Sequence, residues 1–412
     1  MTPQAFSYPT LASNGMIYVP PYGLNDSIDY MLKIDPKTYE VKKLQVYTSG
    51  KTERWMYGVE VNKWIYFFPY NESVILAVNT RTDSVEHIHL DWPAGTKDVK
   101  GKFISCHAYN NNIISLPYGE DVSFNHALVF DTNLRKGTFV EINCDVLDSK
   151  KWHTSQILDN TIYAVPRGET PKDCYFPYAV EFNCDTLEYV LVNMSGYWSD
   201  IDSEEFSNKK YTTLAKSNGK LYAPPYSENP KFDIMLKYDK EWSALHTGIT
   251  GTSRKYFTHT TASNGKIYFP PAGHDNDWSD LLIIDSNTDN WYTKSLGIGK
   301  ESKKYFIGCE NSQGKIFWIP RGGCVCEPEI DWKKSGDLAE ILVVDTKDDS
   351  YYTVDVSKYF VDNTTIEKYN ASIIVNNIIF AFPYGQSKTF QNILVFDTIL
   401  ESVVKEINLN DL

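Results

Sequence analysis

One phrase recurs eight times along this chain of 412 residues and constrains its fold more than any other feature. Its clearest copy runs over residues 264–271 (NGKIYFPP), and the apolar segment 282–285 and the pair Trp291-Tyr292 follow it. We align the copies on the proline that ends the apolar run: Pro21, Pro69, Pro117, Pro166, Pro225, Pro271, Pro320 and Pro383. Because the period is only about 46–63 residues, the chain is predicted to be an array of one small unit that packs against its neighbours.

Each copy divides into four short predicted strands. The first is an aromatic run such as residues 256–260, and an Asn-Gly turn (Asn14-Gly15, Asn218-Gly219, Asn264-Gly265) that needs positive φ at both residues follows it. The second strand ends at the aligned proline, and the third ends at an acid that lies 14 residues later in five copies. The fourth is an aromatic or β-branched run such as residues 291–293. Four strands in a unit of this size are typical of a β-propeller blade.

The repeat resembles the kelch type, on the residues Asn264-Gly265-Lys266-Ile267-Tyr268, the segment 282–285 and Asn290-Trp291. Where kelch repeats carry a glycine pair after the second strand, this chain has Pro-Tyr-Gly or Pro-Arg-Gly. The resemblance implies an all-β, single-domain, eight-bladed propeller of four antiparallel strands per blade. The blades would span residues 3–48, 52–92, 101–145, 150–194, 208–248, 254–298, 303–356 and 366–410. We expect the ring to close by blade contact without strand exchange, and a phase shifted by one strand is the alternative.

Composition narrows the choice of partners and compartment. The net charge of −13 argues against nucleic acid and anionic membranes as partners. Residues 1–6 carry no signal-peptide pattern, and the chain has no run of 18 apolar residues. Seven scattered cysteines, an odd number, are expected to be reduced thiols. We therefore expect a cytoplasmic protein.

A basic residue followed by an aromatic opens the first strand in seven copies. The bases are Arg54, Lys102, Lys151, Lys210, Lys255, Lys304 and Lys368. The residue after the aligned proline is Tyr22, Tyr70, Tyr118, Arg167, Tyr226, Ala272, Arg321 or Tyr384. In propellers of this type the first strand is innermost, so both sets are expected near the mouth of the central channel.

Two interpretations of these sets are open. Cations beside phenols predict a site for a partner protein or a small anionic or sugar-like ligand, and Arg167 and Arg321 suit a carboxylate or phosphate best. Alternatively, the lysine stems cover strand ends while their amines bind neighbouring carbonyls, which is a packing role. An architectural scaffold without a ligand is also possible, and the oligomeric state is left open.

Long connections are further candidates, because insertions on a scaffold often carry function. They comprise residues 322–336 with Cys324 and Cys326, residues 198–205, and residues 274–280. One Cys-x-Cys pair is a weak metal signal, and the acidic residues lack calcium-loop spacing. We predict that these connections are solvated acidic loops. We predict neither a metal nor a cofactor.

For catalysis, the first strands offer His107, His153 and His259. Strand parity predicts that His107 and His259 point the same way and His153 the opposite way. With Tyr118 as partner, His107 and His259 could form the acid–base set of a lyase or epimerase acting on an acidic carbohydrate. Packed histidines are the alternative, and no phosphate loop or nucleophile elbow is present. The sequence leaves open whether the protein is an enzyme.

Overall fold

A computed structural model describes residues 6–23, 28–47, 49, 51–121, 123–146, 148–168, 176–198, 209–227, 229–251, 255–271, 279–297, 305–321, 338–360, 368–384 and 391–412. The chain forms two compact units. The first unit combines residues 1–52 with 253–412, and the second comprises residues 53–252.

The first unit contains four sheets, which we number as blades 1, 6, 7 and 8 by their order in the chain. Blade 1 consists of β1 (Thr10–Leu11), β2 (Ile17–Val19), β3 (Tyr30–Ile34) and β4 (Val41–Gln45). Blade 6 consists of β21 (Thr260–Thr261), β22 (Lys266–Phe269), β23 (Asp280–Asp285) and β24 (Asn290–Ser295). Blade 7 consists of β25 (Tyr305–Glu310), β26 (Lys315–Pro320), β27 (Glu340–Asp345) and β28 (Tyr351–Asp355). Blade 8 consists of β29 (Tyr369–Val375), β30 (Ile378–Pro383), β31 (Asn392–Asp397) and β32 (Ser402–Asn408).

The second unit contains blades 2 to 5. Blade 2 consists of β5 (Trp55–Val61), β6 (Trp64–Pro69), β7 (Val74–Asn79) and β8 (Val85–His89). Blade 3 consists of β9 (His107–Tyr109), β10 (Asn112–Ser115), β11 (His126–Asp131) and β12 (Lys136–Glu141). Blade 4 consists of β13 (Ser155–Leu158), β14 (Thr161–Ala164), β15 (Tyr178–Asn183) and β16 (Tyr189–Asn193). Blade 5 consists of β17 (Ala215–Ser217), β18 (Lys220–Ala223), β19 (Ile234–Asp239) and β20 (Glu241–His246). The helices of the described residues are short 3₁₀ turns: η1 (Ser195–Tyr197), η2 (Ser357–Tyr359) and η3 (Leu409–Asp411).

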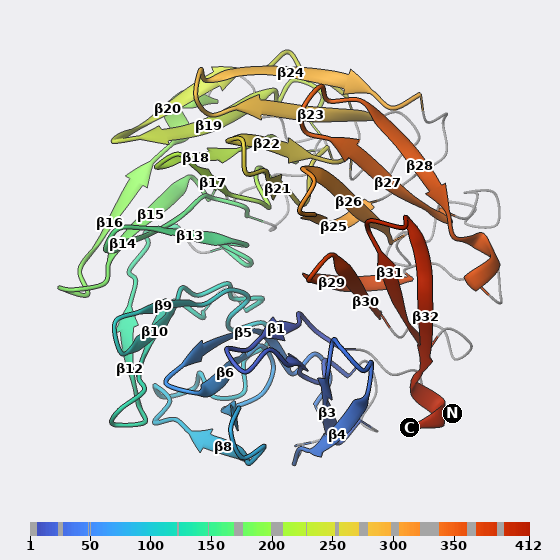
Figure 1. Cartoon of the computed structure of the whole chain (residues 1–412). Helices are drawn as coiled ribbons and strands as arrows, with labels where there is room; N and C mark the ends of the chain where they lie inside the picture. Colours follow the sequence, from blue (N-terminus) through green and yellow to red (C-terminus); the bar gives the residue numbers. More distant parts are fainter. Residues whose placement is uncertain are drawn as a thin grey trace, which may run out of the picture. The chain divides into compact units, whose positions relative to one another are not determined.

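Every blade is built from four consecutive antiparallel strands, which lie side by side in chain order (Figure 1). First strands of neighbouring blades contact each other, as β21 does with β25, β25 with β29, and β29 with β1. The prediction of an all-β propeller with eight four-stranded blades is confirmed. Because each sheet uses consecutive strands, none of the described sheets exchanges a strand with another.

The turn after the first strand differs from the prediction in two of three copies. Asn218 and Gly219 both have positive φ, as expected for a two-residue hairpin. At Asn14-Gly15 and Asn264-Gly265, however, only the glycine is left-handed, with φ of 81° and 85°. There the asparagine side chain accepts a hydrogen bond from the amide two residues later, Met16 or Lys266. The asparagine therefore acts as a local acceptor in a longer loop.

The third strand ends at an acid in six blades, and in five of them this acid has the same structural role. Directly after β3, the Asp35 carboxylate accepts from the Lys37 amide at 2.8 Å, and the Asp35 carbonyl accepts from the Tyr39 amide at 2.8 Å. The same side-chain bond recurs at Asp131, Asp285, Asp345 and Asp397. The residue four positions after the acid consequently adopts positive φ, with Tyr39 at 63° and Asp349 at 60°. The repeated acid thus shapes the turn between the third and fourth strands.

Apolar side chains from adjacent blades form the core. One buried cluster joins Phe6, Ile17 and Leu32 of blade 1 to Phe380 and Val395 of blade 8. Leu409 of η3, 1% exposed, completes this cluster. The first and last blades are therefore held together by side-chain packing.

Candidate functional site

In the second unit, a series of backbone hydrogen bonds links two of the repeated positions. These are the basic residue before each first strand and the residue after each aligned proline. The amide of each post-proline residue donates to the carbonyl of its own blade's base, and the next base's amide donates to that post-proline carbonyl. The seven bonds, of 2.7–3.0 Å, connect in order Arg54, Tyr70, Lys102, Tyr118, Lys151, Arg167, Lys210 and Tyr226. In the first unit, Lys368 donates to the Arg321 carbonyl and Tyr384 donates to that of Lys368. Both repeated positions therefore connect neighbouring blades through their backbones.

The side chains of the repeated bases are buried. Six are at most 1% exposed, namely Arg54, Lys102, Lys151, Lys210, Lys255 and Lys368, and Lys304 lies outside the described residues. The amine of Lys102 donates to the carbonyls of Asn71, Glu72 and Val99, at 3.4, 3.0 and 2.7 Å. Such bonds are needed because an uncompensated buried charge is costly.

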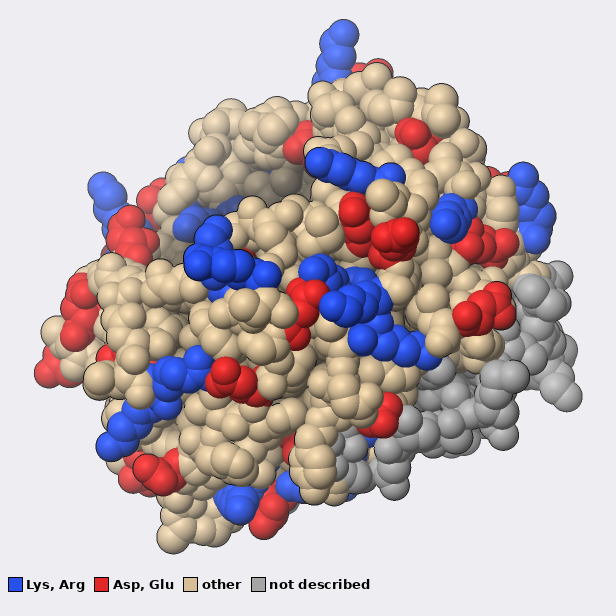
Figure 2. Space-filling view, turned by 60° about the horizontal axis from the view of Figure 1, so that its bottom comes forward, with Lys and Arg blue, Asp and Glu red and all other residues tan. Residues whose placement is uncertain are grey.

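Several of these amines also lie over aromatic rings. Lys102 Nζ is 5.3 Å from the Trp92 ring centroid, and Lys210 Nζ is 5.2 Å from that of Trp198. Lys151 donates to the Phe124 carbonyl at 3.2 Å, and burial lowers the pKa of its amine. By contrast, the face drawn in Figure 2 shows exposed Lys and Arg side chains interspersed with Asp and Glu. The described contacts of the repeated bases are packing contacts, and their role in ligand binding stays a prediction.

The densest group of predicted site residues lies in blades 2 to 4. Arg167 Nη1 donates to the Tyr118 hydroxyl, and its guanidinium carbon is 5.7 Å from the Tyr118 ring centroid. The His153 ring meets the Tyr118 ring edge-on, with the centroids 5.6 Å apart. Arg167 is 7% exposed and Tyr118 is 3% exposed, so this guanidinium lies in a largely dry environment. We call Tyr118, His153 and Arg167 the Arg167 cluster.

Tyr70 of blade 2 also contacts the Arg167 cluster. The Tyr70 ring lies 6.0 Å from that of Tyr118, and the Tyr70 hydroxyl donates to Glu120 Oε1 at 2.8 Å. Glu120 in turn pairs with Lys150 Nζ at 3.7 Å. The tight backbone here requires glycine: at Gly119, with φ of 65°, a Cβ atom would lie 2.9 Å from the Phe124 carbonyl oxygen. The Pro-Tyr-Gly sequence therefore places Tyr118 against Arg167 and Glu120 against Tyr70.

The remaining post-proline residues form smaller groups. In the first unit, the Arg321 guanidinium carbon is 5.3 Å from the Tyr384 ring centroid, and the Tyr22 ring lies 6.4 Å from it. Tyr226 of the second unit is 3% exposed. Each predicted arginine therefore stacks on a predicted tyrosine of a neighbouring blade.

The histidines of the predicted catalytic set have other partners. His107 Nε2 lies 2.7 Å from Ser155 Oγ, and His259 packs against the Phe269 ring at 5.9 Å. Burial lowers the pKa of each imidazole to about 4. The two histidines belong to different units, and the histidine whose ring contacts Tyr118 is His153. The acid–base role of His107, His259 and Tyr118 stays a prediction.

The three long connections lie largely outside the described residues, including Cys324, Cys326 and residues 199–205 and 272–278. At their margins, Trp198 is 1% exposed and Asp280 begins β23. Within the described part of the chain, no three His, Cys, Asp or Glu side chains form a group that could hold a metal.

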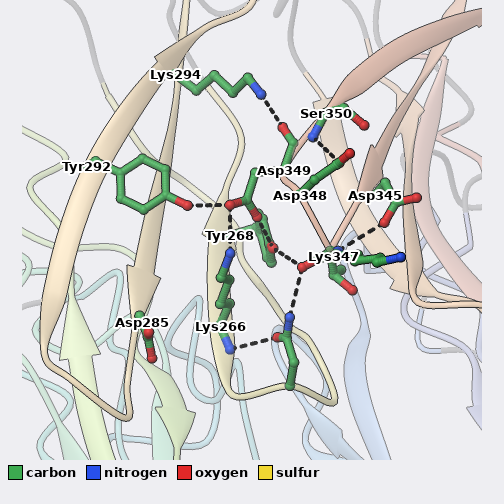
Figure 3. Close-up of polar contacts among 12 residues, drawn as sticks. Lys266, Tyr268, Asp285, Tyr292, Lys294, Asp345, Lys347, Asp348, Asp349 and Ser350 are labelled. Atoms are coloured by element: carbon green, nitrogen blue, oxygen red, sulfur yellow. Dashed lines mark hydrogen bonds and ion pairs between the residues drawn. The ribbon is translucent and has the colours of Figure 1, made fainter.

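The structure also reveals a set of contacts that the sequence reasoning missed. The left-handed residue of a third-to-fourth-strand turn reaches into the preceding blade, between its second and fourth strands. In blade 7 this residue is Asp349, which is 7% exposed (Figure 3). Its carboxylate accepts from Lys266 Nζ at 2.6 Å, from the Tyr268 hydroxyl at 2.5 Å, and from the Tyr292 hydroxyl. Its carbonyl accepts from Lys294 Nζ.

Other blades use the same position with different chemistry. Glu401 of blade 8 accepts from Lys315 at 2.8 Å and from Tyr352. Arg135 of blade 3 lies over the Trp64 ring at 4.6 Å and pairs with Glu86 at 2.5 Å. Tyr39 of blade 1 packs on the Phe380 ring at 6.1 Å. We call these residues the interblade plugs; the signal that could have found them is their position four residues after the repeated acid.

No protein-family model matches the chain, and no curated protein sequence matches it either. Many solved structures have a similar fold, and three of them illustrate the likeness. Apo AztD from Citrobacter koseri has a TM-score of 0.56 at 11% identity, covering 93% of each chain. BamB from Moraxella catarrhalis has a TM-score of 0.52 at 10% identity, covering 92% of this chain and 97% of that one.

The third is the catalytically inactive histidine-to-alanine variant of virginiamycin B lyase from Staphylococcus aureus with quinupristin. Its TM-score is 0.51 at 10% identity, covering 77% of this chain and 92% of that one. At such identities the likeness establishes the fold alone, because one fold carries many functions. The chain is an eight-bladed β-propeller.

Proposed function

We propose that this protein is a kelch-like binding propeller whose ligand presents a carboxylate or phosphate to the Arg167 cluster. The ligand would be a small anionic or sugar-like molecule or an acidic segment of a partner protein. One observation carries the proposal: the guanidinium of Arg167 is fixed between blades by stacking and hydrogen bonding to Tyr118, whose ring also contacts that of His153.

The geometry and burial of Arg167 both favour binding of an anion. A guanidinium presents planar pairs of N–H donors that match carboxylate and phosphate oxygens. Since Arg167 already stacks on Tyr118, little side-chain entropy is lost when it binds. Aromatic faces such as Tyr70 and Tyr118 can pack against sugar rings, and Arg321 over Tyr384 repeats the pair in the first unit.

A lyase or epimerase acting on an acidic carbohydrate is the second candidate. It is supported by the proximity of a phenol, an imidazole and a guanidinium, since proton abstraction beside a carboxylate needs an acid–base pair and a cation. The structurally similar virginiamycin B lyase also depends on a histidine, as its inactive variant indicates. The test is elimination from polygalacturonate, followed by ultraviolet absorbance, in His153→Ala and in the His107→Ala, His259→Ala double variant. Undiminished turnover in both would reject this candidate.

Calorimetric titration with D-galacturonate and with inorganic phosphate tests the binding function. We expect binding of at least one of the two, with D-galactose as the neutral comparison. Arg167→Gln should weaken it about tenfold or more, because a charge-assisted hydrogen bond contributes about 1.5–3 kcal/mol. Arg81→Gln, at an exposed turn of blade 2, removes the same charge and should leave affinity unchanged. Equal affinities in the two variants, or no binding of either anion, would contradict the proposal.

We also propose a cytoplasmic location, with neither nucleic acid nor membrane as partner, from the acidic composition. Among the described residues, no helix has the length and apolar character needed to cross a bilayer. Fractionation of cells that produce the tagged protein would test the location.

A further inference from the structure

Ser155 lies where the first strands of blades 3 and 4 meet. It opens β13, and its hydroxyl oxygen is 2.7 Å from His107 Nε2 and 2.8 Å from Ser105 Oγ. His107 opens β9, and Ser105 and His107 are both partly exposed, whereas Ser155 is 5% exposed. Two hydroxyl groups and one imidazole therefore converge between the first strands of blades 3 and 4.

The contact between serine and histidine has the geometry of an activated nucleophile. A serine hydroxyl is a weak nucleophile until an adjacent base takes its proton, and the two must lie within hydrogen-bond distance. With its pKa lowered to about 4 by burial, His107 is neutral at pH 7. In the tautomer that carries its proton on Nδ1, its Nε2 can accept the Ser155 proton.

Position alone does not explain this pairing. Ser155 lies 11 residues before Pro166, and Ser372 lies 11 residues before Pro383 in blade 8. Ser372 Oγ donates to the Ile307 carbonyl at 3.0 Å and lies 4.0 Å from Cys309 Sγ. A serine hydroxyl at this position can thus bridge two blades without a histidine. Ser155 differs from Ser372 in that its partner on the neighbouring blade is a histidine, His107.

A cation lies close to the pair. Lys216 of β17, on the first strand of blade 5, donates to the Ile157 carbonyl of β13 at 2.6 Å, and its positive charge adds to the burial that lowers the pKa of His107. Lys216 is exposed, so it can also attract a negatively charged substrate group. The Ser105 hydroxyl, beside Ser155, can rotate to donate to a developing oxyanion.

We propose that Ser155 is a nucleophile, activated by His107, that hydrolyses small esters carrying a negative charge. Ser155 Oγ attacks the carbonyl carbon while its proton passes to His107 Nε2. The bond from that carbon to the leaving oxygen breaks, and the released alcohol takes the proton from His107. Water then attacks the acyl carbon and gives a proton to His107, which returns it to Ser155 Oγ as the acid leaves.

A fluorophosphonate probe tests the nucleophile directly, because attack forms an oxygen–phosphorus bond and releases fluoride. We expect one adduct by intact mass, located on Ser155 by peptide mapping. Ser155→Ala should abolish labelling and His107→Gln should slow it at least tenfold, whereas Ser372→Ala should label at the wild-type rate. Circular dichroism of each variant checks folding, and Ser155→Cys, treated with iodoacetamide, provides a second test if Ser155→Ala does not fold.

Several outcomes would overturn the proposal. They are an unlabelled wild-type protein, an adduct on another serine, labelling that does not depend on His107, and, in Ser155→Cys, iodoacetamide reaction at the introduced thiol no faster than at Cys309. The result is independent of the Arg167 cluster, because Arg167→Gln should lose anion binding and keep fluorophosphonate labelling.

Discussion

Burial of His259 ties the stability of the protein to pH. Its pKa falls to about 4 in the native state because burial disfavours the charged ring, while an unfolded histidine titrates near about 6.5. As pH decreases from about 6.5 to about 4, the unfolded chain binds a proton that the native state does not. The free energy of unfolding should therefore decrease over this range.

His259→Gln should remove part of that decrease, about 1–3 kcal/mol between pH 7 and pH 4.5. Urea unfolding at the two pH values measures it. His89→Gln, at an exposed position of β8, is the matched control and should keep the wild-type pH dependence. If His259→Gln and wild type lose the same stability on acidification, the buried imidazole does not supply the effect.

At the scale of elements, Asp349 joins the turn between β27 and β28 to the second and fourth strands of blade 6 through hydrogen bonds. Burial opposes ionisation of its carboxyl, but hydrogen bonds from Lys266, Tyr268 and Tyr292 outweigh burial and lower its pKa. Its stabilising contribution is present above the unfolded pKa of about 3.8–3.9 and is lost as pH falls through the lower native pKa.

Asp349→Asn should reduce the free energy of unfolding at pH 7 by about 1–3 kcal/mol, because Lys266, Tyr268 and Tyr292 lose their charged acceptor. Asparagine tolerates the left-handed φ of 60°, so the backbone is not the cause of the loss. Asp348→Asn makes the same change at the exposed neighbouring residue and should cost under about 0.5 kcal/mol. Equal losses in urea unfolding would show that the plug contributes no specific stability.

The two kinds of interblade contact differ in how far a sequence can reveal them. The repeated base is visible as a pattern, but the pattern suits both a solvent-facing cation and an ammonium that binds carbonyls, as Lys102 does. The interblade plugs share a position and not a residue type: Tyr39, Arg135, Asp349 and Glu401 have different chemistries. Repetition of identity therefore finds the former and misses the latter.

At the scale of the whole molecule, the fold was predictable because its signals are periodic and local. Aligned prolines and the acids that end most third strands predicted eight blades of four strands, since each marks a local backbone requirement of the blade. The residues of the Arg167 cluster were candidates from the sequence, but their contacts with one another were not predictable. The edge-on contact of His153 with Tyr118 depends on how neighbouring blades are placed. Strand parity, which predicted a different orientation for His153 and His107, contains no information on that placement.

Packing between the first and last blades should contribute measurably to the free energy of unfolding. Leu409, 1% exposed, joins the cluster that contains Phe6 and Ile17 of blade 1 with Phe380 of blade 8, and its amide donates to the Gln391 carbonyl. Leu409→Ala should lower the free energy of unfolding by about 2–5 kcal/mol, because it removes apolar contacts and leaves a cavity between two blades. Leu412→Ala makes the same truncation three residues later, where the side chain is 42% exposed, and should cost under about 0.5 kcal/mol. Urea unfolding followed by tryptophan fluorescence measures both, and a loss at Leu409 no larger than at Leu412 would show that η3 does not hold these blades together.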